Sequence, residues 1–166
     1  GSGEFGHMTI EHNGNLCTCG SRGCLEAHAS FEVLARKLFS ITTSPELKDL
    51  YGSVRATETS EIHFLKRALE IDRASTESVF DEYATDIGIA LKNLVNIFAP
   101  DYVLIGGEAL EFSALFLEKS INYAKKNAFS SLADAVKFDI DIIGEKAWTL
   151  GCIYRVIESE LFTVGR

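Results

Sequence analysis

The chain is organised around residues 3–26, GEFGHMTIEHNGNLCTCGSRGCLE, which gather most of its candidate metal-binding side chains. Three of the four cysteines in the chain, Cys17, Cys19 and Cys24, lie close together in this stretch. Glycines between and beside them supply the positive-φ turns that a tight loop around an ion needs. Three thiolates and one imidazole form the closed tetrahedral set that holds structural zinc. We therefore expect a zinc-binding loop near the N-terminus.

Two histidines precede the cysteines, and the residues alone leave the fourth ligand open. Gly1-Ser2 is typical of a protease-cleavage scar, and Glu4-Phe5 and His7-Met8 are dipeptides that common cloning sites also encode. If residues 1–8 came from a vector, His12 would be the natural fourth ligand. If they are native, His7 is equally available.

Composition places the chain among ordinary globular proteins. Its 166 residues suit one domain or one lobe, with 46% hydrophobic and 24% charged residues. A net charge of −8 argues that this chain does not bind DNA or an anionic membrane by itself. No apolar run has the length of a membrane span, and no leader peptide opens the chain. We expect a cytoplasmic protein, in which clustered thiols indicate a metal site rather than disulfides.

Hydrophobic periodicity and capping residues predict an α/β chain rich in helices. The expected strands are 5–12, 102–105, buried on both faces, and 138–142, half exposed and peripheral. The expected helices cover about 25–39, 45–51, 60–71, 75–98, 113–127 and 147–162. His28 and His63 fall in two of these helices, where we expect them on the surface without partners.

The strand at 102–105 ends in Gly106-Gly107, and a helix follows. Ligands of open α/β sheets bind at the carboxyl ends of strands, so this turn is a weak candidate for nucleotide binding. Its plainer interpretation is a tight turn between a strand and a helix.

Taken together, these motifs resemble the ROK family of repressors, open reading frames and sugar kinases. Members carry Glu-x-Gly-His, then Cys-x-Cys-Gly-x-x-Gly-Cys-x-Glu, then a strand that ends in Gly-Gly, and the chain matches all three. The resemblance covers essentially the whole chain and places Glu4, Gly6 and His7 in the family motif. It selects His7 over His12 as the fourth ligand, and it leaves residues 1–2 as a scar and residues 3–166 as native.

The resemblance implies a ribonuclease H-like or actin-like ATPase lobe, with a central sheet flanked by helices. It implies a structural Zn²⁺ bound by His7, Cys17, Cys19 and Cys24. It also implies that Glu4, His7 and Glu26 contact sugar hydroxyls. A zinc-bound imidazole keeps its second nitrogen as a donor, and carboxylates accept hydrogen bonds from vicinal hydroxyls, which suits these roles.

What the chain does not contain bears on its function. The phosphate motif and catalytic Asp of a ROK kinase are absent, as is a helix-turn-helix, so we expect a carboxyl-terminal lobe that lacks its N-terminal lobe and any DNA-binding domain. Glu108 after Gly107 would repel a nucleotide, which favours a sugar-responsive repressor of the xylose or N-acetylglucosamine type. A ROK sugar kinase, which would use ATP, is the alternative. The expected partners are a sugar or sugar phosphate, a second copy in a homo-oligomer, and DNA only through the absent domain, with no membrane.

Overall fold

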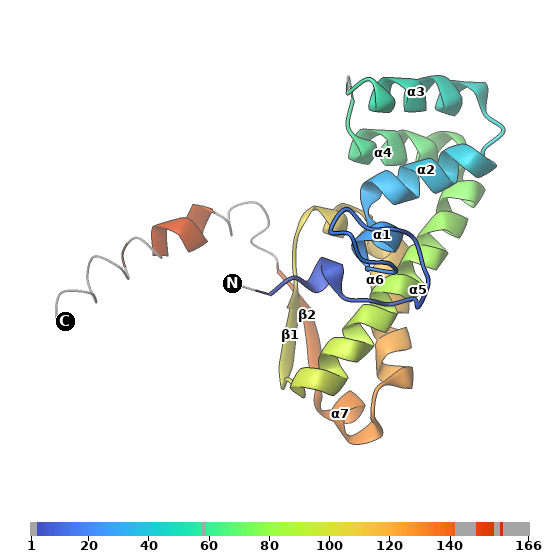
Figure 1. Cartoon of the computed structure of the whole chain (residues 1–166). Coiled ribbons are helices and arrows are strands. Elements are labelled where there is room, and N and C mark those ends of the chain that lie inside the picture. The colour runs from blue at the N-terminus through green and yellow to red at the C-terminus, as the bar shows by residue number, and fades with distance from the viewer. Residues whose placement is uncertain (1–2, 58, 142–148, 155–156, 158–166) are drawn as a thin grey trace.

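The computed structural model describes residues 3–57, 59–141, 149–154 and 157, and most of these residues are helical (Figure 1). None of the helices in that part of the chain is both long and apolar enough to span a bilayer. Over residues 3–141 the labelled elements are η1 (Phe5–His7), α1 (Glu26–Ala29), α2 (Phe31–Ile41), α3 (Pro45–Arg55), α4 (Glu61–Ile71), α5 (Arg73–Phe98), β1 (Tyr102–Ile105), η2 (Glu108–Phe112), α6 (Ser113–Asn127), α7 (Ser130–Ala135) and β2 (Lys137–Ile140), where η marks a 3₁₀ turn. The α/β class is confirmed, with a smaller sheet than expected.

Helix α5 is the longest helix in the described part of the chain. Its 26 residues correspond to a rod of about 39 Å at 1.5 Å per residue. In Figure 1, α3 and α4 lie toward one end of this rod and α7 toward the other. Helix α6 packs closely along it, because Gly88 leaves room for Tyr123 and the buried Ser120 hydroxyl lies 2.9 Å from the Ala84 carbonyl oxygen.

Hydroxyl or carboxylate side chains cap the starts of α2, α3, α4 and α5. Ser44 and Ser60 accept hydrogen bonds from the backbone N–H groups of Leu47 and His63, which confirms two predicted helix starts. The single helix expected over residues 25–39 is wrong. Ser30 is extended (φ −90°, ψ 159°) and caps α2, so the segment divides into the short α1 and the longer α2.

Asp72 ties the start of α5 to the loop after α2. Its carboxylate accepts hydrogen bonds from the Ser75 N–H at 3.3 Å and from the buried Thr42 hydroxyl at 2.9 Å. Burial raises the pKa of Asp72, but these hydrogen bonds outweigh it and hold the pKa below its ordinary value. The stabilisation is therefore present above the ordinary carboxyl pKa and is lost as the pH falls through the lowered value.

We expect Asp72→Ala to lower the free energy of unfolding by about 1–2 kcal/mol at pH 7, the usual effect of removing an N-cap. The loss should shrink in acid, where the wild-type carboxyl is protonated as well. Urea denaturation at pH 7 and at pH 3 measures both values. Asp72→Asn, which keeps an acceptor oxygen, should lose less. An equal loss at both pH values would contradict the role of the carboxylate.

The described sheet consists of β1 and β2, which run parallel with Tyr102 opposite Lys137 and Ile105 opposite Ile140. Val103 faces a small core that includes residues of α5, α6 and α7. Tyr102 and Leu104 point the other way and are 51% and 60% exposed. The prediction that this strand is buried on both faces is wrong for the described residues, because their helices pack on one face. The second strand, expected over 138–142, covers Lys137–Ile140, and only Phe138 is partly buried in it; residue 142 lies outside the described residues.

The strand expected at residues 5–12 is also wrong. A 3₁₀ turn occupies Phe5–His7, and only Thr9 then forms a single antiparallel bridge, to Cys24. The alternation of Met8 and Ile10 indicated a strand, but the partner segment turns away at Gly23 after that one bridge. Of the last predicted helix, 149–154 and 157 are helical, and the rest lies outside the described residues.

Candidate metal centre and the residues around it

Four side chains converge at the N-terminal loop. One ring nitrogen of His7 and the sulfurs of Cys17, Cys19 and Cys24 all lie within 4.8 Å of one another. The Cys19 and Cys24 sulfurs are 3.7 Å apart, and the Cys17 sulfur is 3.6 Å from His7 Nδ1. Zinc bonds of about 2.3 Å to sulfur and about 2.0 Å to nitrogen give tetrahedral edges of about 3.8 and 3.6 Å. The donor set and its spacing fit a structural zinc ion.

Backbone hydrogen bonds fold the loop around this cluster. The Cys17 N–H donates to Ser21 O, the Gly20 N–H donates to Cys17 O, and the Gly23 N–H donates to Asn15 O. Gly20 and Gly23 adopt φ values of +89° and +73°, which residues other than glycine rarely adopt. The glycines of the motif thus set the path that brings three cysteines to one point.

The thiols of the cluster differ in acidity without a metal. Backbone hydrogen bonding at Ser21, followed by the neighbouring Cys17, lowers the pKa of Cys19 to about 7. Burial, followed by the neighbouring Cys19, raises the pKa of Cys24 to about 12. Cys24 therefore carries its proton at neutral pH, whereas Cys19 is partly a thiolate.

Metal uptake should release the Cys24 proton, because zinc binds thiolates. For each proton that zinc displaces, the affinity falls tenfold when the pH falls by one unit. We therefore expect the zinc affinity to drop at least about 100-fold from pH 8 to pH 6. Competition with a chromophoric chelator at pH 6, 7 and 8 measures the change. An affinity that does not vary with pH would contradict thiolate ligation.

The residues expected to contact sugar are only partly gathered. Glu26 lies beside the cluster, with one oxygen 3.7 Å from His7 Nδ1 and the other accepting a hydrogen bond from the Thr18 hydroxyl at 3.3 Å. Its side chain is 45% exposed. Glu4 is exposed and makes no side-chain hydrogen bond or ion pair with another described residue. Thr18 carries no sequence signal for this contact, since only the folded loop brings it to Glu26.

The remaining histidines differ from one another. His12 lies exposed in a turn, as expected, and His63 is exposed on α4. The prediction for His28 is wrong, because this side chain is buried and uses both ring nitrogens. Nε2 accepts the Asn15 N–H at 3.2 Å, and Nδ1 lies 3.4 Å from a Glu11 carboxylate oxygen. The helical pattern could not reveal these partners, which lie in the loop before the cysteines.

The Gly106-Gly107 turn follows β1 at the carboxyl end of the sheet. Gly107 has a φ of +109°, which suits glycine, and a Cβ atom on Gly106 would lie 3.1 Å from the side chain of Asp141. Glu108, next in the chain, is exposed. Two carboxylates therefore lie near the edge where the sequence suggested a weak nucleotide site.

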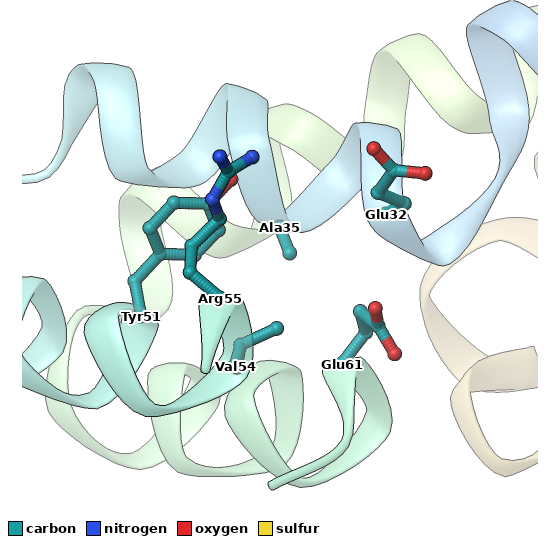
Figure 2. A pocket seen from close by; sticks show the side chains of 6 residues that line it. All are labelled: Glu32, Ala35, Tyr51, Val54, Arg55 and Glu61. Atoms are coloured by element: carbon teal, nitrogen blue, oxygen red, sulfur yellow. The ribbon is translucent and has the colours of Figure 1, made fainter. Parts of the chain in front are cut away.

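A separate hollow lies between α2, α3 and α4 (Figure 2). Its volume is about 160 Å³. Ala35, Tyr51 and Val54 form apolar walls, and the lining also carries charged residues of both signs, Glu32, Arg55 and Glu61. None of the residues proposed from the sequence lines it.

Comparison with known proteins identifies the group to which this architecture belongs. The ROK family model matches residues 1–157. A putative xylose repressor from Caldicellulosiruptor sp. (strain Rt8B.4) is 34% identical over 96% of this chain, which spans 40% of that protein. A glucokinase from Halalkalibacterium halodurans is 30% identical over 96% of the chain, which spans 48% of the enzyme.

The fold agrees with these sequence matches. The crystal structure of a ROK family transcriptional regulator, a homologue of the E. coli MLC protein, aligns with a TM-score of 0.64. The alignment has 21% identity and covers 84% of this chain and 34% of that one. The chain thus spans less than half the length of these relatives. It belongs to the ROK family, and xylose repressors are among its relatives.

Proposed function

We propose that this chain is the sugar-sensing effector lobe of a ROK transcriptional repressor, and that its zinc loop shapes one wall of a carbohydrate-binding cleft. The observation that carries the proposal is the position of Glu26. Its half-exposed carboxylate lies against both the metal-binding His7 and the Thr18 hydroxyl of the same loop. A loop with four metal donors thereby holds an acceptor group toward solvent.

Zinc in this loop would be bound by His7, Cys17, Cys19 and Cys24, and it would supply a cross-link in place of a disulfide. Nδ1 of His7 lies 3.6 Å from the Cys17 sulfur, so zinc bound through Nδ1 would leave Nε2 as an N–H donor. A donor at His7 and an acceptor at Glu26 would then lie side by side. That pair suits the hydroxyls of a sugar, each of which both donates and accepts. Glu4 would join them from the turn before His7.

In the intact protein, sugar binding would favour one arrangement of the lobes and shift the population of DNA-competent molecules. The names of the xylose repressors among its relatives support the repressor assignment. Glu108 and Asp141 support it as well, because carboxylates at the carboxyl edge of the sheet disfavour nucleotide phosphates. A role on DNA also places the protein in the cytoplasm.

The assignment is tested with the full-length gene product and a DNA fragment from its own promoter region. We expect the protein to shift the fragment in a gel, and xylose, N-acetylglucosamine or a related sugar to release it. A gene without a helix-turn-helix upstream of Gly3 would overturn the repressor assignment.

A ROK sugar kinase is the second candidate, favoured by the 30% identity to the H. halodurans glucokinase. In that case Gly106 and Gly107 would approach the bound ATP. A coupled assay of the full-length protein with ATP and a panel of hexoses and amino sugars decides between the two. Turnover would support the kinase, and its absence would support the repressor.

A second copy of the protein is the expected partner, in a homo-oligomer. Large apolar side chains are exposed at the end of α5, on β1 and just before α7. They are Ile97, Phe98, Tyr102, Leu104 and Phe129. Such side chains are usually covered in an assembled protein. Light scattering of the full-length protein measures the assembly.

A further inference from the structure

His28 occupies an unusual place for a helical histidine. It lies in α1, four residues after Cys24, and only 8% of it is exposed. The Asn15 N–H donates to Nε2, so this nitrogen is a hydrogen-bond acceptor. Nδ1 faces the carboxylate of Glu11. The ring therefore contacts the chain on both sides of the turn at Asn13-Gly14.

The same turn is packed tightly against the imidazole. A Cβ atom on Gly14 would lie 2.5 Å from His28 Nε2 and 2.9 Å from the Gly23 Cα atom. The Asn15 side chain adds a hydrogen bond to the Ala27 carbonyl oxygen at 3.1 Å. Only a residue without a side chain fits at Gly14 while the histidine stays in place.

The turn matters because it joins the two halves of the metal cluster. Nine residues separate His7 from Cys17, and no helix or extended strand fixes their path. Their backbone is tied to Gly23, through the N–H groups of Ile10 and Glu11 and the carbonyl of Asn15. Three further hydrogen bonds tie them to α1 and the residue before it: the Leu25 N–H donates to Met8 O, the Asn15 side chain donates to Ala27 O, and the Asn15 N–H donates to the His28 imidazole.

We propose that His28 is a positioning residue of the metal centre, which holds the Glu11–Asn15 turn so that His7 and Cys17 reach the ion together. The inference rests on the proposed zinc site. His28 does not bind the metal. It acts through Nε2 as the acceptor for the Asn15 N–H. Replacing His28 leaves all four ligands in the chain, but the distance between His7 and Cys17 is then no longer fixed.

The test compares zinc affinities by chelator competition and the absorption spectra of the Co²⁺-loaded proteins. His28→Phe keeps the ring shape without the acceptor and is expected to bind zinc 10–100-fold more weakly, with an altered Co²⁺ spectrum. His28→Gln places an acceptor oxygen at a similar reach and should stay within about threefold of the wild type. Gly14→Ala, which pushes the turn off the imidazole, should behave like His28→Phe. His63→Phe, on the exposed face of α4, is the control and should change neither value.

The outcomes separate this inference from the zinc site itself. A wild-type protein that binds no zinc would overturn both. Zinc binding by His28→Phe with wild-type affinity and spectrum would overturn the role of His28 alone. Equal weakening in His28→Gln and His28→Phe would overturn the acceptor role of Nε2. If His28→Phe does not fold, Gly14→Ala and His28→Gln give the same comparison.

Discussion

Replacing Cys24 with serine is expected to reduce bound zinc from about one ion per chain to near zero. Cys24 is fully buried, its backbone forms the bridge to Thr9, and its sulfur lies 3.7 Å from the Cys19 sulfur. Serine preserves the size of the side chain but is a poor zinc ligand. Structural zinc contributes about 10–16 kcal/mol of apparent binding free energy in small zinc-binding peptides, and the loop should lose most of its order with the ion.

The helices should survive this change, because the main core is formed by residues of α2 to α6 and the η2 turn. We therefore expect normal far-ultraviolet circular dichroism, with faster hydrogen exchange at the N–H groups of Cys17, Gly23 and Leu25. Mass spectrometry under native conditions counts the zinc. Cys152→Ser, at the exposed cysteine outside the cluster, is the matched control and should keep its ion. A Cys24→Ser protein with stoichiometric zinc would contradict the assigned ligands.

Replacing Gly23 with alanine is expected to lower the free energy of unfolding by about 3 kcal/mol. The φ of +73° costs a residue with a side chain about 1–2 kcal/mol. The added Cβ atom would lie 1.7 Å from the Glu11 carbonyl oxygen, so that segment must move. Its movement breaks the hydrogen bonds from Ile10 and Glu11 to Gly23 O, worth about 0.5–1.5 kcal/mol each.

Gly20 provides the control for this substitution. It has a similar φ of +89°, but a Cβ atom there would meet nothing within 4 Å. Gly20→Ala should therefore cost only the conformational strain of about 1–2 kcal/mol. Urea denaturation of the two zinc-loaded variants measures the difference. Equal losses would show that strain alone, rather than the contact with Glu11, explains the effect.

The sequence predicted the metal cluster because its spacing is local. Cys17, Cys19 and Cys24 are near neighbours in the chain, and the family motif selected His7 over His12. The structure brings His7 to the cysteines and leaves His12 exposed. Helix starts at Ser44 and Ser60 were predictable for the same reason, since a cap acts within three residues.

Features that depend on distant partners could not be predicted. A helical histidine such as His28 gives no sign that its partners, Glu11 and Asn15, lie 17 and 13 residues before it. The apolar run of β1 indicated burial on both faces, yet burial depends on which elements cover the strand. The segment at 5–12 alternated like a strand, but Gly23 limits its pairing to one bridge. The contact between Thr18 and Glu26 likewise exists only once the loop is closed.

The most direct test of the account is a calorimetric titration of the zinc-loaded, full-length protein with a panel of sugars that includes xylose, N-acetylglucosamine and glucose. We expect one sugar to bind, and Glu26→Gln to weaken it about 10–100-fold, as expected when hydrogen bonds to a charged acceptor are lost. Glu118→Gln, at an exposed position on α6, should bind as the wild type does. Absence of sugar binding, or equal affinity in Glu26→Gln and the wild type, would contradict a sugar-sensing site at the zinc loop.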